Sequence, residues 1–255
     1  MTSARRVLTL LLALAAGRAS PQTMLDQQQR LIDIHCLLLD LPPVEAPGAY
    51  APWQLGLGLE LIGIPPIDGT TGSKKQITAS DRAPVFPRPR VTLGLPAPEG
   101  WRAFAGASYI PPVVINDLST NYGALEAGLA WAPGPLHVGL RGHVLYADSK
   151  APVTDPSTRD TLRTFEWGFD ASAGWTFAFG SWSATPYAGL GVVVLDGRFT
   201  VTSDGVELRS SYTGLSLHGG VRVLLGGHWA GVAEVDAYPG RLVHPTFRAV
   251  YAFSP

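Results

Sequence analysis

Several things are scarce in this sequence, and each scarcity excludes a class of protein. There is one cysteine, Cys36, so an intrachain disulfide cannot form. Charged residues make up 15% of the 255 residues, well below the quarter that is usual in soluble proteins. The formal net charge is -1 and Lys and Arg do not cluster, so we expect no nucleic-acid partner. Apolar runs stay shorter than the roughly 20 residues that a membrane-spanning helix needs.

The N-terminus is expected to be a secretory signal peptide. Arg5 and Arg6 are followed by an apolar run from Val7 to Ala16 and by small residues up to Ala19. A basic start, a short apolar stretch and a small-residue cleavage site are the parts of such a signal. We therefore predict that residues 1–19 are removed on export, and we expect no transmembrane helix.

Residues 20–50 differ in pattern from the rest of the chain. The stretch TMLDQQQRLIDIHCLLLDLPP combines helix formers with apolar residues three and four apart, and it ends at Pro42 and Pro43. We predict a short helix in a periplasmic N-terminal segment. It could be a plug or a periplasmic docking element, and we favour a helix that caps the domain that follows. His35 and Cys36 are too few ligands for a metal site, so we expect no metal.

Apolar and polar residues alternate almost without interruption from residue 51 onward. In LHVGLRGHVLYAD, residues 136–148, a strand would place the Leu, Val and Tyr side chains on one side and His137, Arg141 and His143 on the other. Ten segments follow this pattern, with lengths near the roughly 9–11 residues that cross a membrane as a tilted strand. Long polar links, among them residues 68–84, 111–121 and 196–205, alternate with tight turns such as APGP, as in barrels whose turns are short at one end only.

This pattern predicts an all-β fold. The predicted domain is a transmembrane up-and-down antiparallel β-barrel of about 10 strands over residues 51–255, with the short helical segment before it. The sheet must close, because an open edge would leave backbone groups without partners in lipid. The main alternative is a soluble secreted lipocalin-like binding barrel, which would need an apolar lumen and a polar exterior.

The aromatic residues gather at two levels of the predicted strands. One group lies beside the tight turns or at the start of the first strand, and the other lies beside the long links, both in the apolar phase. Amphipathic rings prefer the level of the lipid headgroups. We predict a membrane-interface belt of Trp53, Trp101, Trp131, Trp175, Trp182 and Trp229 at one level and of Tyr109, Tyr146 and Trp167 at the other.

The polar face of the strands would line the lumen, and its charges nearly cancel. The predicted lumen charge network consists of Glu60, Arg90, Arg102, Glu126, His137, Arg141, His143, Glu166, Asp170, His218, Arg222, Glu234, Asp236 and Arg248. Across the tight turn at residues 132–135 we expect Glu126 directly opposite Arg141 as an ion pair. Ten strands enclose more than the eight whose side chains just fill a barrel, but far less than a porin. We therefore expect a largely occluded lumen, at most a narrow pore.

The last predicted strand carries FRAVYAF, Phe247–Phe253, in which alternate apolar residues end in Tyr-x-Phe. This strand is similar to the C-terminal assembly signal of the bacterial outer-membrane β-barrel class. The chain resembles that class, small porin-like and OmpA-like barrels in particular, over about residues 51–253 at the level of pattern. Residues 254–255 follow the final aromatic residue, which departs from the signal.

The resemblance implies a location and partners. We expect the outer membrane of a Gram-negative bacterium, contact with outer-membrane lipid and lipopolysaccharide, and insertion by the barrel-assembly machinery. The link around Lys74 and Lys75 could bind a polyanionic surface such as lipopolysaccharide, although a charged loop is more often simply solvated. A structural or interaction role, or narrow passive passage of small solutes, is the expected function, and the oligomeric state stays open.

Ser216, His218 and Asp236 offer a weak catalytic alternative. Placing Leu225 opposite Trp229 sets His218 opposite Asp236 with Ser216 on the same face, and these residue types act together in hydrolases, including lipid-processing barrels. No oxyanion-hole feature accompanies them. We therefore expect a structural His–Asp pair, no enzyme, no catalytic residues and no cofactor.

Overall fold

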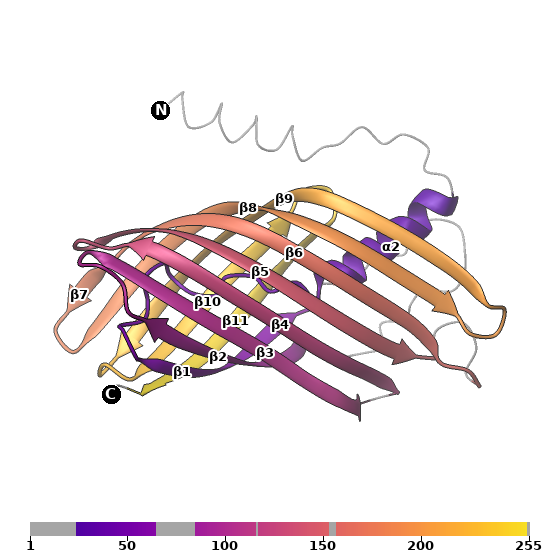
Figure 1. Cartoon of the computed structure of the whole chain (residues 1–255), viewed down its shortest axis with the longest axis horizontal. Coiled ribbons are helices and arrows are strands. Elements are labelled where there is room, and N and C mark those ends of the chain that lie inside the picture. Colours follow the sequence, from indigo (N-terminus) through magenta and orange to yellow (C-terminus); the bar gives the residue numbers. More distant parts are fainter. Residues whose placement is uncertain (1–23, 65–84, 116, 153–156, 254–255) are drawn as a thin grey trace, which may run out of the picture.

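The sheet curls into a closed barrel around part of the N-terminal segment, as Figure 1 shows for the computed structural model of this chain. The structure describes residues 24–64, 85–115, 117–152 and 157–253. The elements are α2 (Met24–Leu37), β1 (Leu55–Gly63), β2 (Val85–Leu95), β3 (Trp101–Ile115), β4 (Leu118–Trp131), β5 (Leu136–Ala151), β6 (Asp160–Trp175), β7 (Phe177–Phe179), β8 (Trp182–Val201), β9 (Val206–Leu225), β10 (Trp229–Tyr238) and β11 (Leu242–Phe253).

Ten long strands form the wall of the barrel. Successive strands pair antiparallel, β6 pairs with β8 and β1 pairs with β11, so the ring closes. The strand β7 has only 3 residues and pairs with the start of β8. The predicted all-β fold, an up-and-down barrel of ten strands with a short N-terminal helix, is confirmed.

The wall is apolar on the outside and charged on the inside. On β5, Leu140 is 68% exposed whereas Arg141 beside it is 7% exposed. The same alternation recurs on β6, where an exposed Phe169 is followed by a buried Asp170. A soluble lipocalin-like barrel would have the reverse polarity, so that alternative is wrong. An apolar outer wall of this kind is kept out of water by membrane lipid.

Several strands run farther than the sequence pattern predicts. The strands β8 and β9 have 20 residues each, and residues 202–205 connect them. Likewise, β3 runs to Ile115 and β4 begins at Leu118. The prediction of long links at these two places is wrong, because their polar residues continue the strands beyond the apolar band. Asp196 and Arg198, for example, form an exposed ion pair at 3.5 Å on β8.

Two prolines shape the start of β2. Pro87 and Pro89 pair with β1 only, and the pairing of β2 with β3 covers only Arg90 to Leu95. A proline cannot donate to a ladder, so it is tolerated where one side of the strand has no partner. The strand can therefore begin at Val85, ahead of both prolines, and this places Arg88 in the lumen.

The described part of the N-terminal segment lies inside the barrel. We expected residues 20–50 to be periplasmic and to cap the domain, and that position is wrong for the residues that the structure describes. Leu37, Leu41 and Val44 have no exposed surface, and α2 contacts β8 and β9 (Figure 1). The physical reason is that ten strands enclose more space than their own inward side chains fill.

The helix itself is confirmed as α2, Met24–Leu37. Within the described residues, no helix is both long enough and apolar enough to cross a bilayer. The predicted signal peptide, residues 1–19, lies outside the described residues and stays a prediction.

Candidate functional site: the plugged lumen

Residues 38–50, which we name the plug segment, follow α2 along the inside of the barrel. Arginines of the wall donate to its backbone carbonyl groups. The bonds join Arg88 Nη1 to Leu39 O (3.3 Å) and Asp40 O (2.5 Å), Arg90 Nη1 to Pro42 O (3.0 Å) and Arg141 Nη2 to Leu41 O (2.8 Å). Buried carbonyl groups need a donor, and here guanidinium groups replace the ladder that a strand would have. The plug segment is thus fixed to β2 and β5 through its main chain.

Two more contacts hold the plug segment farther along. The Val44 N–H donates to Glu234 Oε1 at 2.9 Å. Glu45 lies between two arginines, with Arg222 Nε at 2.6 Å and Arg248 Nη1 at 3.6 Å. These contacts add β9, β10 and β11 to the strands that hold the plug segment.

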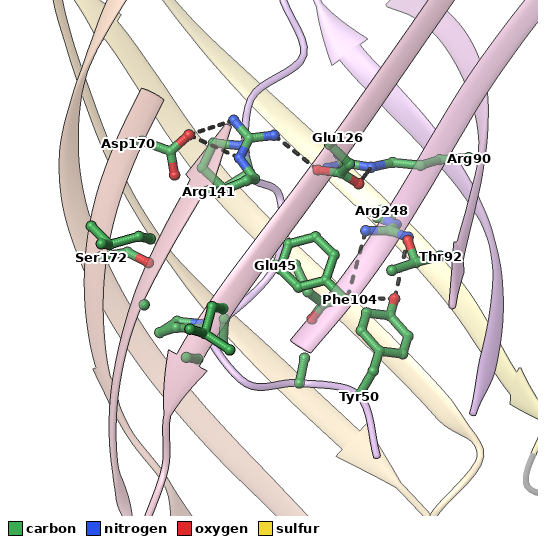
Figure 2. Close-up of a pocket in the computed structure, with 18 residues that line it drawn as sticks. Glu45, Tyr50, Arg90, Thr92, Phe104, Glu126, Arg141, Asp170, Ser172 and Arg248 are labelled. Atoms are coloured by element: carbon green, nitrogen blue, oxygen red, sulfur yellow. Dashed lines mark hydrogen bonds and ion pairs between the residues drawn. The ribbon is translucent and has the colours of Figure 1, made fainter. Parts of the chain in front are cut away.

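A chain of buried ion pairs crosses the lumen beside the plug segment. Arg90 Nη1 donates to Glu60 Oε1 at 2.7 Å. Figure 2 shows the continuation of the chain, in which Arg90 Nε donates to Glu126 Oε1 at 2.7 Å and Arg141 Nε donates to Asp170 Oδ2 at 2.8 Å. The pairs of the chain are Arg88–Glu60, Arg90–Glu60, Arg90–Glu126, Arg141–Glu126 and Arg141–Asp170, with side chains at most 6% exposed. A buried carboxylate that meets two guanidinium groups recovers much of the free energy that desolvation costs.

Glu126 and Arg141 meet diagonally rather than directly. Trp131 pairs with Val138, so Glu126 faces His143 and the predicted register is wrong by two residues. The reason is that the first two residues of β5 pair only with β6, which widens the turn. The predicted ion pair forms all the same, with Arg141 Nη1 3.0 Å from Glu126 Oε2, because a long side chain reaches a diagonal neighbour.

A second cluster in the lumen brings carboxylates to a histidine. Asp40 Oδ1 of the plug segment lies 3.0 Å from His143 Nε2, and Glu166 Oε1 lies 3.7 Å from the same nitrogen. The Tyr238 hydroxyl donates to Asp40 Oδ2. The cluster therefore joins the plug segment to β5, β6 and β10.

Other predicted lumen residues stand apart from both clusters. His137 Nε2 lies 3.1 Å from Thr176 Oγ1, and Thr246 Oγ1 donates to Asp236 Oδ2 at 3.3 Å. Arg102 is half-buried and has no ion pair within the part of the chain that the structure describes. These three predicted residues thus lie outside the ion-paired part of the lumen.

Sequence reasoning missed Arg88, Asp40 and Glu45. Arg88 could have been found, because Arg88, Arg90 and Thr92 follow the two-residue period of the lumen face, although the intervening prolines argue against a strand. Asp40 and Glu45 had no such signal, because the plug segment has no regular secondary structure and hence no periodicity.

The Ser216, His218 and Asp236 set does not form a catalytic triad. The predicted register is confirmed, since Leu225 pairs with Trp229 and His218 pairs with Asp236. However, His218 Nε2 has no hydrogen-bond partner among the described residues. A triad needs that nitrogen bonded to the nucleophile or the acid, so the geometry gives no support to hydrolysis.

The six tryptophans predicted for the belt at the short turns all point outward. Their exposed fractions run from 41% for Trp101 to 60% for Trp53. The register aligns them, since Trp101 pairs with Trp131, and both Trp182 and Trp229 pair with Leu225. They share a level on the barrel, and their contact with headgroups stays a prediction.

The distance between the first and the second predicted belt matches the height of a membrane's apolar band. Tyr109 and Tyr146 both pair with Gly123, and they are 59% and 49% exposed. From Gly123 to Trp131 is about 27 Å along β4, which at the usual tilt is about 20 Å across a bilayer. Trp167 is also exposed, on the adjacent strand β6. The two levels therefore flank an apolar band of roughly membrane height.

The plug segment and the wall leave little free space between them. A cavity of about 30 Å³, lined by Glu45, Tyr50, Phe104 and Arg248 among others, lies beside the ion-pair chain (Figure 2). That volume holds about two water molecules. At this cavity, the side chains of the wall and the plug segment leave room for little more than water.

A closed barrel with an apolar outer wall and a charged, filled interior defines a transmembrane β-barrel protein. The sequence profile of the outer membrane protein beta-barrel domain family matches residues 97–240, and the chain belongs to this family. Its location is therefore the outer membrane. The chain matches none of the curated protein sequences.

Solved structures resemble this barrel in fold alone. The translocator domain of the autotransporter NalP from Neisseria meningitidis is 13% identical, with 90% of this chain and 95% of that chain covered and a TM-score of 0.44. Ail of Yersinia pestis is 12% identical, with 80% of this chain and 100% of that chain covered and a TM-score of 0.36. Identities this low extend to no property beyond the fold.

Proposed function

We propose that this protein is a self-plugged outer-membrane barrel that is closed at rest. Its role is structural or interactive, and small solutes pass only when the plug segment moves. The observation that supports this proposal is the set of wall arginines bonded to the carbonyl groups of residues 39–42. Buried hydrogen bonds to charged groups contribute about 1.5–3 kcal/mol each. Spontaneous release of all of them together is therefore rare.

The geometry also suggests from which side the plug segment can be reached. In bacterial barrels the short turns face the periplasm. Helix α2 lies toward the opposite end, where Ser210 Oγ donates to Asp33 Oδ1 at 2.6 Å and Arg241 Nε pairs with Asp33 at 3.1 Å. We infer that α2 occupies the outer mouth of the barrel and that the plug segment ends at the periplasmic mouth.

Conductance across a planar bilayer tests this proposal. The parent chain should give no current steps above background, whereas a variant lacking residues 24–50 should give steady steps. A parent that conducts as readily as the deletion variant refutes the proposal. Folding of each protein is checked first by heat-modifiable migration on a gel and by circular dichroism.

A point variant covers the case in which the deletion variant does not fold. Glu45→Gln removes the charge that pairs with Arg222 and Arg248 and leaves the fold of the wall in place. It should open more often than the parent, while Glu207→Gln, which changes an exposed pair on the extension of β9, should behave as the parent does. Equal behaviour of all three proteins contradicts a plug that controls opening.

Partners of the outer surface remain proposals as well. We propose that the aromatic belts contact outer-membrane lipid, that lipopolysaccharide surrounds the outer end and that the barrel-assembly machinery recognises β11. In support, Phe247 and Phe253 of β11 are 55% and 46% exposed on the outer wall. The link that carries Lys74 and Lys75 lies outside the described residues.

A further inference from the structure

The plug segment and the wall bring three metal-ligand atoms together. Asp40 Oδ1, His143 Nε2 and Glu166 Oε1 lie within 4.8 Å of one another. Two of the separations are 3.0 Å and 3.7 Å. Ligands bonded to zinc at about 2.0–2.1 Å in a tetrahedron lie about 3.3 Å apart. The two separations from His143 Nε2 are therefore close to those of one coordination sphere, and the third separation is at most 4.8 Å.

These same atoms lack other partners. Among the described residues, no hydrogen bond reaches Asp40 Oδ1, His143 Nε2 or either carboxylate oxygen of Glu166. The three side chains are only 4%, 5% and 0% exposed. An ionised carboxylate buried in this way is costly unless a cation or a donor meets it.

The neighbouring ion-pair chain shows how this lumen meets its other acids. Glu60 and Glu126 each bond two arginines. Glu166, in contrast, has no ion pair with an arginine within the described residues, and its near neighbours are Asp40 and His143. Two carboxylates and one imidazole converge here, and neither carboxylate forms an ion pair with an arginine of the described residues, which is a cation-binding arrangement.

The donor set selects the class of metal. One imidazole nitrogen with two carboxylate oxygens suits first-row divalent transition ions such as zinc. Calcium is a poor match, because it takes six to eight oxygen ligands. The Tyr238 hydroxyl also donates to Asp40 Oδ2, which orients that carboxylate. Arg141 Nη2 lies 3.3 Å from His143 Nδ1, and a guanidinium can only donate, so Nδ1 accepts in this arrangement. Metal binding at Nε2 therefore requires the proton to move to Nδ1, while Arg141 Nη2 keeps Leu41 O and Asp170 Oδ2 as partners.

We propose that Asp40, His143 and Glu166 bind a first-row divalent transition-metal ion, and that this ion fastens the plug segment to β5 and β6. The first half of the proposal concerns the binding site alone. The second half, in which the ion acts as a latch, rests on the proposed function, because it needs a plug segment that can move.

Zinc binding by the full-length protein in detergent tests the first half. The parent, stripped with a chelator, reloaded with zinc and passed through a desalting column, should retain one zinc per chain by elemental analysis. His143→Gln and Glu166→Gln should each weaken binding by at least about tenfold. His218→Gln is the matched control, since His218 is also a buried lumen histidine with an unpartnered Nε2 but lies outside the cluster, and it should bind as the parent does.

Two results overturn the site. One is a parent that retains no stoichiometric zinc, which would mean that a proton shared by Asp40 and Glu166 is enough to neutralise the cluster. The other is a His143→Gln variant that retains zinc as tightly as the parent. Glu166→Gln keeps the shape of the side chain and removes its charge, so it should fold even where other variants do not.

Alkylation of Cys36 tests the latch. This buried thiol in α2 becomes reactive only when the helix leaves the lumen. Zinc should slow its alkylation at least about tenfold in the parent and should have no effect in His143→Gln. An equal rate with and without zinc in a parent that retains the metal refutes the latch. A conducting parent that still retains zinc would refute the proposed closed state and leave the site standing, so the two failures are distinguishable.

Discussion

A second cysteine at residue 197 should lock α2 inside the barrel. Gly197 faces the lumen on β8, and a Cβ atom added to it would lie 2.9 Å from Cys36 Sγ. That is about the separation between a Cβ atom and the far sulfur of a disulfide. The change Gly197→Cys therefore places two thiols at bonding distance without any movement of the backbone.

The size of the effect follows from the length of chain that the bond would close. A disulfide that closes a loop of about 160 residues removes unfolded-state entropy equivalent to about 5 kcal/mol. Some of this is lost, since the new Cβ also lies 2.9 Å from Ile32 Cγ2 and the Ile32 side chain must shift. Gly197→Ser has the same steric cost and no second thiol, so it is the matched control.

The assay compares oxidised and reduced protein in detergent. After oxidation of the folded barrel, a maleimide polymer added in denaturant should label no thiol of Gly197→Cys and one thiol of Gly197→Ser. The urea midpoint of oxidised Gly197→Cys should exceed that of the reduced form. If both thiols of the folded variant stay free after oxidation, Cys36 is not beside β8 and the placement of α2 in the lumen is refuted.

Three further predictions address the network, the thiol and the belts. Glu126→Ala leaves two buried guanidinium groups without their shared carboxylate and should lower the free energy of unfolding by about 3–5 kcal/mol. The exposed control Glu207→Ala should lower it by less than about 1 kcal/mol. Equal urea midpoints of the two variants would contradict a stabilising role of the buried ion pairs. Burial removes the Cys36 thiol from solvent and raises its pKa, so at pH 8 its alkylation should be far slower in the folded barrel than in the unfolded chain. Comparable rates would show an accessible thiol. Lipids brominated near the headgroup should quench tryptophan fluorescence more than lipids brominated near the chain ends, because six tryptophans including Trp229 share one level; the reverse order rules out the belt.

The wall of the barrel was predictable because its information is local. Each strand alternates two environments, so Leu140 and Arg141 reveal opposite faces without knowledge of any partner strand. The register of β9 with β10 was predictable as well, because three residues at most separate the strands and Leu225 must pair with Trp229. At the wider turn between β4 and β5 the same reasoning was wrong by two residues, since the geometry of that turn depends on β6.

The contents of the lumen were not predictable in the same way. Asp40 meets His143 and Glu166 although about 100 residues or more separate it from either in the chain. No period or spacing marks such a contact, because the plug segment is irregular and its position depends on the space left by all ten strands. The composition of residues 20–50 predicted a helix and nothing about which side of the wall the helix occupies.

Alternation, aromatic placement and scarcity of charge by themselves determined that this chain is a membrane barrel with an apolar exterior and a charged interior. Only the tertiary structure decided that the interior is filled by the chain's own N-terminal segment and that its charges are divided between an arginine-bridged chain and a carboxylate–histidine cluster. The physical reason is that a face is a property of neighbouring residues along one strand, whereas the occupancy of a lumen depends on the closed ring as a whole.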